Sequence, residues 1–573
     1  MLKRTVHFLG LVKNGKYKHY STKLSYVHNI GEKPLRYITI GHLLEEAACK
    51  FSERKAIISR HQNKSLTFAE TLVQADKLAA GLTKIGLQRK DRVGLWAPNL
   101  IEWYITKLAC ARAGLIMVGL NPANEPSEIE YCVNKVGIKT MVCGNKFRSQ
   151  DYYESLLVIA PELKKCDPGK LKSARVPALR TVITMSEDQK RGTYNFQEII
   201  NLADNNDISY IHNLQNKISP DEPCNLQFTS GTTGKPKAVV CSHFSIVNNG
   251  CLYGKRNELS QKHTICSLVP FFHIFGIVAA IIAPLYHGST IVLPTDGYDP
   301  NKSLAAIKEE RCTIVVGTPT MYVDLVHLQE ERKLKISLEI ASIGGALCTS
   351  DLMKKMLTVL NLKTILSVYG LSEASGALFQ GLKTDTNNKI LSTVGCVSEH
   401  VEAKVIDNNG NLVPCGTAGE LCVRTYSNML GYWEDEETTK NVMGQDGWLK
   451  TGDQFILNED GYGQIVGRFK EMIIRGGENI YPKEIEEFLN THPDILETHV
   501  IGSSHARLGE EICACIRIKP GSNVTSETIV SFCKGQLAYF KIPSKIKIMD
   551  EFPRTTSGKV QKFKLKEMII NSV

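Results

Sequence analysis

The chain has 573 residues, more than one ordinary hydrophobic core accommodates, so its length predicts two or more domains. Hydrophobic residues make up 43% and charged residues 22%, which excludes a fibrous or disordered protein and is typical of a soluble globular one. The formal net charge is +10, but much of it lies in residues 1–31, and the remainder is too small to indicate a nucleic-acid partner.

Residues 1–31 have the composition of a targeting segment. They are rich in lysine and hydroxyl side chains and contain no acidic residue, which is typical of a mitochondrial transit peptide. The apolar run 6–12 is too short for a secretory signal, and a disordered basic tail is the alternative. The 17 cysteines include no Cys-x-x-Cys pair, which indicates reduced thiols inside the cell. We therefore expect the mitochondrial matrix.

Residues 35–220 alternate helical and extended patterns. We expect helices at 40–51, 66–85 and 100–113, and strands at 56–59, 92–97 and 116–119. This alternation predicts parallel sheets covered by helices. The polar segment 166–177 is interpreted as a surface insertion.

A run of hydroxyls, glycines and lysines follows the extended segment 224–228. It comprises Thr229, Ser230, Gly231, Thr232, Thr233, Gly234, Lys235, Pro236 and Lys237. The two glycines allow successive N–H groups to turn toward an anion, and the lysines add positive charge. Only two residues separate the glycines, so the run is not a Walker A loop. It predicts a phosphate-binding loop, with a solvated turn as the alternative.

Residues 263–295 contain no Asp, Glu, Lys or Arg and are long enough to cross a bilayer. Two prolines and two histidines interrupt them, and no anchoring flank is evident. We therefore expect a buried strand, a loop at 271–274 and a buried helix at 276–283, and no transmembrane segment. Taken alone, His273 in this run is a packed core residue.

Three further motifs follow in the second half of the chain. Residues 369–374 read Tyr-Gly-Leu-Ser-Glu-Ala and come after an apolar run. Residues 447–453 end in Asp453, and Arg468 follows shortly afterwards; an ion pair between the two is one interpretation. Residues 553–560 read Pro-Arg-Thr-Thr-Ser-Gly-Lys-Val. The lysine of that last motif, Lys559, has other lysines close by, which alone would indicate a solvated surface.

Together and in this order, over roughly residues 35–570, these motifs resemble those of the adenylate-forming superfamily of acyl-CoA synthetases, luciferases and peptide-synthetase adenylation domains. Ser372 replaces the usual threonine of its Tyr-Gly-x-Thr-Glu motif and keeps the hydroxyl. The resemblance implies a large N-terminal domain (32–469) of helix-covered sheets, an α/β fold, and a small α+β C-terminal domain (470–573). A hinge at Lys470 would join them. The transit peptide expected from composition (1–31) precedes both domains.

The resemblance also implies roles for single residues. Nucleotide contacts would come from the loop 229–237, from Tyr369 and Gly370, and from Asp453 and Arg468. The substrate pocket would be walled by His273, Gly317, Gly344, Gly345 and Gly395, with Gly476 and Gly477 near the pantetheine tunnel of coenzyme A.

The catalytic residues would be Lys559, His273 and Ser372, and Glu373 would hold Mg²⁺. Lysine suits this role because negative charge builds up where a carboxylate meets the α-phosphate. One carboxylate plus phosphate oxygens is a normal magnesium shell. A carboxylate near a helix N-terminus is the alternative interpretation of Glu373.

We therefore predict an AMP-forming acyl-CoA synthetase that uses ATP, Mg²⁺ and coenzyme A to convert a fatty acid to its thioester through acyl-AMP. The overall sequence and its basic N-terminal segment most resemble the mitochondrial medium-chain acyl-CoA ligases of this superfamily. The alternatives are an aromatic-acid CoA ligase, a luciferase-like or amino-acid-adenylating enzyme, and an inactive nucleotide-binding scaffold. The sequence gives no oligomeric state.

Overall fold

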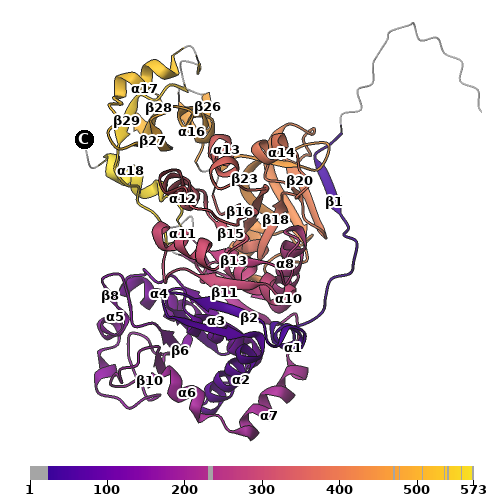
Figure 1. The fold of residues 1–573 in the computed structure, drawn as a ribbon, viewed down its shortest axis with the longest axis vertical. Helices are drawn as coiled ribbons and strands as arrows, with labels where there is room; N and C mark the ends of the chain where they lie inside the picture. Colours follow the sequence, from indigo (N-terminus) through magenta and orange to yellow (C-terminus); the bar gives the residue numbers. More distant parts are fainter. Residues whose placement is uncertain are drawn as a thin grey trace, which may run out of the picture.

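The computed structural model describes residues 23–229, 236–346, 348–468, 471–475, 478–505, 508–534, 536–537, 541–556 and 558–570. They form a large domain of three sheets and a small domain at one end of the long axis, next to α12 and α13 (Figure 1). The predicted α/β architecture with a small α+β C-terminal unit is confirmed. Within the described ranges, no helix is long and apolar enough to cross a membrane.

The first sheet has eight strands, with β6, β4, β5 and β11 parallel at its centre. In spatial order the strands are β10 (Tyr194–Asn195), β9 (Thr181–Thr184), β6 (Ile138–Cys143), β4 (Arg92–Trp96), β5 (Ile116–Leu120), β11 (Pro223–Thr229), β12 (Lys237–Ser242) and β22 (Gly431–Tyr432). Strand β12 runs antiparallel to both of its neighbours, β11 and β22, so the consecutive strands β11 and β12 form a hairpin.

The second sheet has nine strands, and six of them, from β17 to β2, run parallel. Their order is β19 (Cys396–Val397), β18 (Gly376–Gln380), β17 (Thr364–Leu371), β16 (Ile340–Gly344), β15 (Ile314–Gly317), β13 (Thr264–Ser267), β14 (Thr290–Leu293), β2 (Lys55–Ser59) and β3 (Lys64–Thr67). The strands β14, β15 and β16 are buried along their whole length, and β13 is buried except at Thr264, as expected when helices cover both faces.

Helices fill the space between these two sheets and cover their outer faces. The inner layer comprises α1 (Ile40–Phe51), α2 (Phe68–Lys84), α3 (Ile101–Arg112), α6 (Phe196–Leu202), α7 (Asn205–Leu214), α8 (His243–Arg256), α9 (Ile274–Gly276), the π-helix η3 (Ile277–Ile282) and α10 (Ala283–His287). The first sheet is covered by α4 (Pro126–Val136) and α5 (Tyr152–Ile159), and the second by α11 (Pro300–Glu309), α12 (Pro319–Arg332), α13 (Ser350–Val359) and α14 (Asn387–Ser392).

Local sequence explains most of these boundaries. The helix predicted at 66–85 begins at Phe68, because Leu66 and Thr67 pair with β2 and Thr67 forms a capping box with Glu70. The apolar stretch 263–295 forms β13, α9, η3, α10 and β14 in the core, as predicted. In the segment 166–177, expected on the surface, Leu171 and Val176 are buried, so part of it packs against the domain.

The third sheet is antiparallel and closes the large domain. Its strands are β1 (Tyr26–Asn29), β20 (Val401–Ile406), β21 (Ala418–Thr425), β23 (Leu449–Leu457) and β24 (Gly463–Arg468), and α15 (Glu436–Val442) lies between β22 and β23 in the chain. From β1 the chain runs as an extended ribbon along the side of the domain to α1 (Figure 1). Ser25, just before β1, is fully buried.

The small domain packs helices on an antiparallel sheet to which β29 adds one parallel strand. Its strands are β25 (Ile473–Arg475), β26 (Glu478–Ile480), β27 (Ile495–His505), β28 (Gly509–Ile518) and β29 (Lys545–Ile548), and its helices are α16 (Pro482–Leu489), α17 (Ser526–Cys533) and α18 (Lys562–Ile570). Cys513 and Cys515 lie on one buried face of β28.

Candidate active site

The described ends of the predicted phosphate loop lie at the tip of the β11–β12 hairpin. Thr229 pairs directly with Lys237 across the two strands. The backbone oxygen of Pro236 accepts a hydrogen bond from the Tyr131 hydroxyl at 2.9 Å. The residues between them, Ser230, Gly231, Thr232, Thr233, Gly234 and Lys235, lie outside the described residues.

Tyr432 connects this hairpin to Glu373. The ammonium group of Lys237 lies 5.0 Å from the centroid of the Tyr432 ring, and the Tyr432 hydroxyl donates a hydrogen bond of 3.0 Å to Oε1 of Glu373. Burial and the nearby Glu373 carboxylate raise the pKa of Tyr432, so its phenol stays protonated as a donor. Sequence reasoning missed Tyr432, because nothing in its neighbourhood marks it as functional.

The motif at 369–374 lies where β17 turns back into β18. A Cβ atom at Gly370 would stand 1.9 Å from the backbone oxygen of Gly376, so only glycine allows the two strands to approach this closely. Ser372 and Glu373 form the short 3₁₀ turn η4 (Ser372–Ala374) that follows. The turn therefore presents the Glu373 carboxylate beside Tyr432.

Tyr369 and Asp453 are in direct contact. The Tyr369 hydroxyl donates to Oδ2 of Asp453 at 2.7 Å, and the Tyr369 ring packs against Phe379 and Phe455. Both residues are buried, with 7% and 3% of their surfaces exposed. Asp453 on β23 lies opposite Arg468 on β24 in the strand register, so the two predicted nucleotide-binding residues occur as a cross-strand pair.

Lys559 reaches from the small domain into the large one. The Lys559 amide donates to Oγ1 of Thr555 at 3.0 Å, and Gly558 adopts a positive φ of 81° in this tight loop. A Cβ atom at Gly345 would lie 3.5 Å from Cε of Lys559, so the lysine side chain passes the carboxyl end of β16. Burial and the Lys559 charge lower the pKa of His273 to about 3, so His273 is neutral at pH 7.

Of the other predicted pocket residues, His273 lies at the start of a short helix and the glycines lie at strand ends of the second sheet. His273 caps α9, with Nδ1 accepting from the Phe275 amide at 3.2 Å. Gly317 ends β15 and Gly344 ends β16, where a Cβ would stand 2.9 Å from the Val368 backbone oxygen. Gly395 packs on the backbone of Gln380 near β19. The predicted positions Lys470, Gly476 and Gly477 lie outside the described residues.

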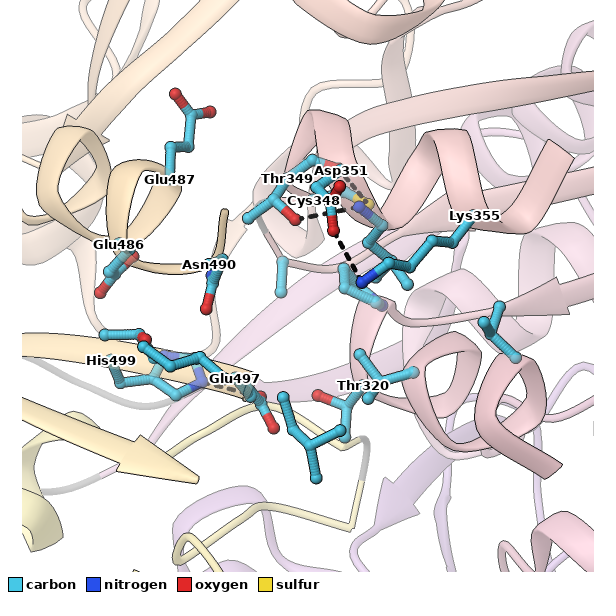
Figure 2. A pocket seen from close by; sticks show the side chains of 18 of the residues that line it. Thr320, Cys348, Thr349, Asp351, Lys355, Glu486, Glu487, Asn490, Glu497 and His499 are labelled. Atoms are coloured by element: carbon cyan, nitrogen blue, oxygen red, sulfur yellow. Dashed lines mark hydrogen bonds and ion pairs between the residues drawn. The ribbon is translucent and has the colours of Figure 1, made fainter. Parts of the chain in front are cut away.

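The small domain is held on the large one by polar contacts. Oγ1 of Thr556 donates to Oδ1 of Asn121 at 2.7 Å, and Oγ1 of Thr320 donates to the Gly558 backbone oxygen at 3.3 Å. Between α12 and α13 on one side and α16 and β27 on the other lies a cavity of about 150 Å³ (Figure 2). No sequence pattern indicates these two hydrogen bonds, because they join residues more than two hundred positions apart.

In the described part of the chain, no group of three or more His, Cys, Asp or Glu side chains could hold a metal ion. The carboxylate of Glu373 lies where the hairpin and η4 meet. This fits an ion such as Mg²⁺ that takes most of its ligands from water and a bound phosphate.

The sequence was compared with protein families and with individual proteins. Residues 44–433 match the family described as AMP-binding enzyme, and residues 484–559 match the AMP-binding enzyme C-terminal domain. The chain is 42% identical over 547 residues to "Medium-chain acyl-CoA ligase ACSF2, mitochondrial" of Danio rerio, covering 95% of this chain and 90% of that one. It is 40% identical to the Homo sapiens protein of the same name, with the same coverage.

The fold was compared with solved structures. The crystal structure of the anthranilate CoA ligase AuaEII in complex with anthranoyl-AMP superimposes with a TM-score of 0.82. The match covers 94% of this chain and 99% of that one at 24% sequence identity. At this identity the likeness concerns the fold alone.

Proposed function

The chain belongs to the AMP-binding enzyme family, and we propose that it is an ATP-dependent fatty acid–CoA ligase acting on medium-chain fatty acids. The single observation that carries this proposal is the identity of about 40% along nearly the whole chain to medium-chain acyl-CoA ligases. It does not favour the aromatic-acid, luciferase-like or scaffold alternatives.

In the first half-reaction, a fatty carboxylate oxygen forms a bond to the α-phosphorus of ATP, and the bond from that phosphorus to pyrophosphate breaks. Negative charge accumulates on the oxygens where the carboxylate and α-phosphate meet. Lys559 would bind there and stabilise that charge electrostatically. His273 is neutral and adds no second charge, which fits a role as a packing or hydrogen-bonding wall for the acyl carboxylate.

The nucleotide would be held by residues of the large domain. We assign the phosphates to the loop 229–237, the adenine to the face of Tyr369 with Gly370, and the ribose hydroxyls to Asp453 with Arg468. The hydrogen bond from Tyr369 supports this assignment, because it fixes the orientation of the Asp453 carboxylate. Ser372 would contribute its hydroxyl at the adjacent turn.

Glu373 would hold Mg²⁺, which when bound neutralises charge on the polyphosphate. The hydroxyl of Tyr432 orients the carboxylate for this purpose. In the second half-reaction, the thiolate of coenzyme A attacks the acyl carbon and AMP leaves with the carboxylate oxygen. We assign the hinge for this step to Lys470, the approach of the pantetheine arm to Gly476 and Gly477, and the acyl pocket to Gly317, Gly344, Gly345 and Gly395.

A mitochondrial location agrees with the names of the relatives. We propose the matrix, with the basic N-terminal segment as the targeting signal. Burial of Ser25 and the pairing of β1 with β20 support removal upstream of Ser25, so that β1 remains in the mature large domain.

The function is tested by measuring pyrophosphate release with ATP-Mg and a panel of C4 to C16 fatty acids, aromatic acids and amino acids, with and without coenzyme A. We expect turnover that depends on coenzyme A and is greatest for fatty acids of medium length. Adenylation that ignores coenzyme A, a preference for aromatic acids, or no turnover with any acid would contradict the proposal.

A further inference from the structure

A buried ion cluster lies where the small domain meets α12, at one end of the cavity between the domains. Glu497 and His499 from β27 lie side by side in this cavity, across from Thr320 (Figure 2). Neither Glu497 nor His499 was predicted to have a function. The cluster joins parts of the chain that must separate if the small domain turns.

Glu497 is the centre of the cluster. Its side chain is only 10% exposed, yet it accepts hydrogen bonds from Nε2 of His499 at 2.8 Å and from Nη2 of Arg554 at 2.5 Å. Burial alone would raise the pKa of Glu497, but the His499 hydrogen bond and the Arg554 charge lower it to about 2. Glu497 is therefore ionised at pH 7 and can hold Arg554.

Arg554 connects three segments. Besides its bond to Glu497, its Nη1 donates to Oγ1 of Thr320 at 2.5 Å and to the Gly558 backbone oxygen at 3.3 Å. Thr320 belongs to α12 of the large domain, and Gly558 directly precedes Lys559. Arg554 thus holds the loop of the lysine against the large domain while Glu497 holds Arg554.

A second ion pair crosses the same boundary. Nη2 of Arg517 on β28 lies 3.3 Å from Oδ1 of Asp324 on α12, and its Nη1 lies 3.8 Å from Oε2 of Glu497. Asp324 and Thr320 are one helical turn apart, so both contacts are made by the same face of α12. Rotation of the small domain would break both contacts together.

We propose that Glu497 is a positioning residue for the adenylation half-reaction, acting with Arg554 and Arg517 as a latch that docks the Lys559 loop on Thr320 and Asp324. This inference rests on the proposed function, because it assigns the docked arrangement to the first of two half-reactions. The latch stabilises the arrangement in which the Lys559 side chain lies beside Gly345. It does not stabilise the arrangement reached after the small domain has turned. Its loss shifts the population away from the docked state.

The test separates the two half-reactions. The variant Glu497→Gln keeps the shape of the side chain and removes its charge. We expect its single-turnover rate constant for acyl-AMP formation to fall by about tenfold or more, with the KM for ATP unchanged. The coenzyme A step, started from preformed acyl-AMP, should stay within about twofold of the parent. Asp324→Asn removes a charge on the large-domain side of the same contact, and it should also slow acyl-AMP formation more than the coenzyme A step.

Glu487→Gln is the matched control. Glu487 lines the same cavity and lies on the same domain, but its ion pair at 3.6 Å is with Lys483 of its own helix. The same loss of charge there should alter neither half-reaction. Slowing of both half-reactions by Glu497→Gln to the same extent, or of neither, would overturn the latch.

Amide hydrogen exchange supplies a readout that needs no activity. Peptides covering residues 553–560 and 318–324 should exchange faster in Glu497→Gln than in the parent and in Glu487→Gln. Unchanged exchange in both peptides would overturn the proposal. If the parent makes no acyl-AMP from any fatty acid, the proposed function fails, whereas this exchange experiment still decides whether the latch exists.

Discussion

Replacing Tyr369 by phenylalanine removes one hydroxyl and leaves the ring that packs on Phe379 and Phe455. The lost hydrogen bond is 2.7 Å long and ends on the buried carboxylate of Asp453. A hydrogen bond to a charged group contributes about 1.5–3 kcal/mol, and burial of both partners favours the upper part of that range. We therefore expect Tyr369→Phe to lower the free energy of unfolding by about 2–3 kcal/mol.

Tyr253→Phe is the matched comparison. The Tyr253 hydroxyl is also buried and donates over 2.7 Å, but its acceptor is the neutral hydroxyl of Ser342. Loss of such a bond costs about 0.5–1.5 kcal/mol. Urea denaturation compares the two variants, and steady-state kinetics gives the KM for ATP, which should rise only in Tyr369→Phe. Equal losses of stability, or an unchanged KM for ATP in Tyr369→Phe, would refute the reasoning.

Two further predictions concern the other ends of the site and of the chain. Lys559→Ala should slow acyl-AMP formation by about 10²–10³-fold, as expected for a lost electrostatic contact in the transition state, while calorimetry shows ATP binding retained; unchanged adenylation would contradict its assigned role. Deletion of residues 1–31 should lower the melting temperature below that of the chain lacking residues 1–22, because β1 and the buried Ser25 are lost. Equal melting temperatures would show that β1 is dispensable.

The fold could be predicted largely from local pattern. The helices α1 and α3 and the strands β4 and β5 agree with their predicted ranges to within a residue or two, because hydrophobic periodicity reports which face of each element is buried. The error at α2 came from extending a helical period through Thr67, although the Thr67–Glu70 capping box was readable in the sequence.

The strand β1 was not predicted, because four residues are too few for an alternating pattern to outweigh a composition that indicates a targeting segment. The hydrogen-bonded pairs within the site were not predicted either. Tyr369 and Asp453 are 84 positions apart, and Glu373 and Tyr432 are 59 apart, so no local period connects them. Motif order selected the candidate residues, whereas only the folded chain shows which of them meet.

The chemistry of the contact between the domains follows from what the small domain has to do. An apolar interface would hold the two domains firmly, because burial of apolar surface is favourable whatever the detailed geometry. Buried ion pairs add little net stability, since desolvation offsets most of their attraction, but they require one geometry. The contacts of Glu497, Arg554 and Asp324 therefore suit a domain that must dock Lys559 in one orientation and then leave it.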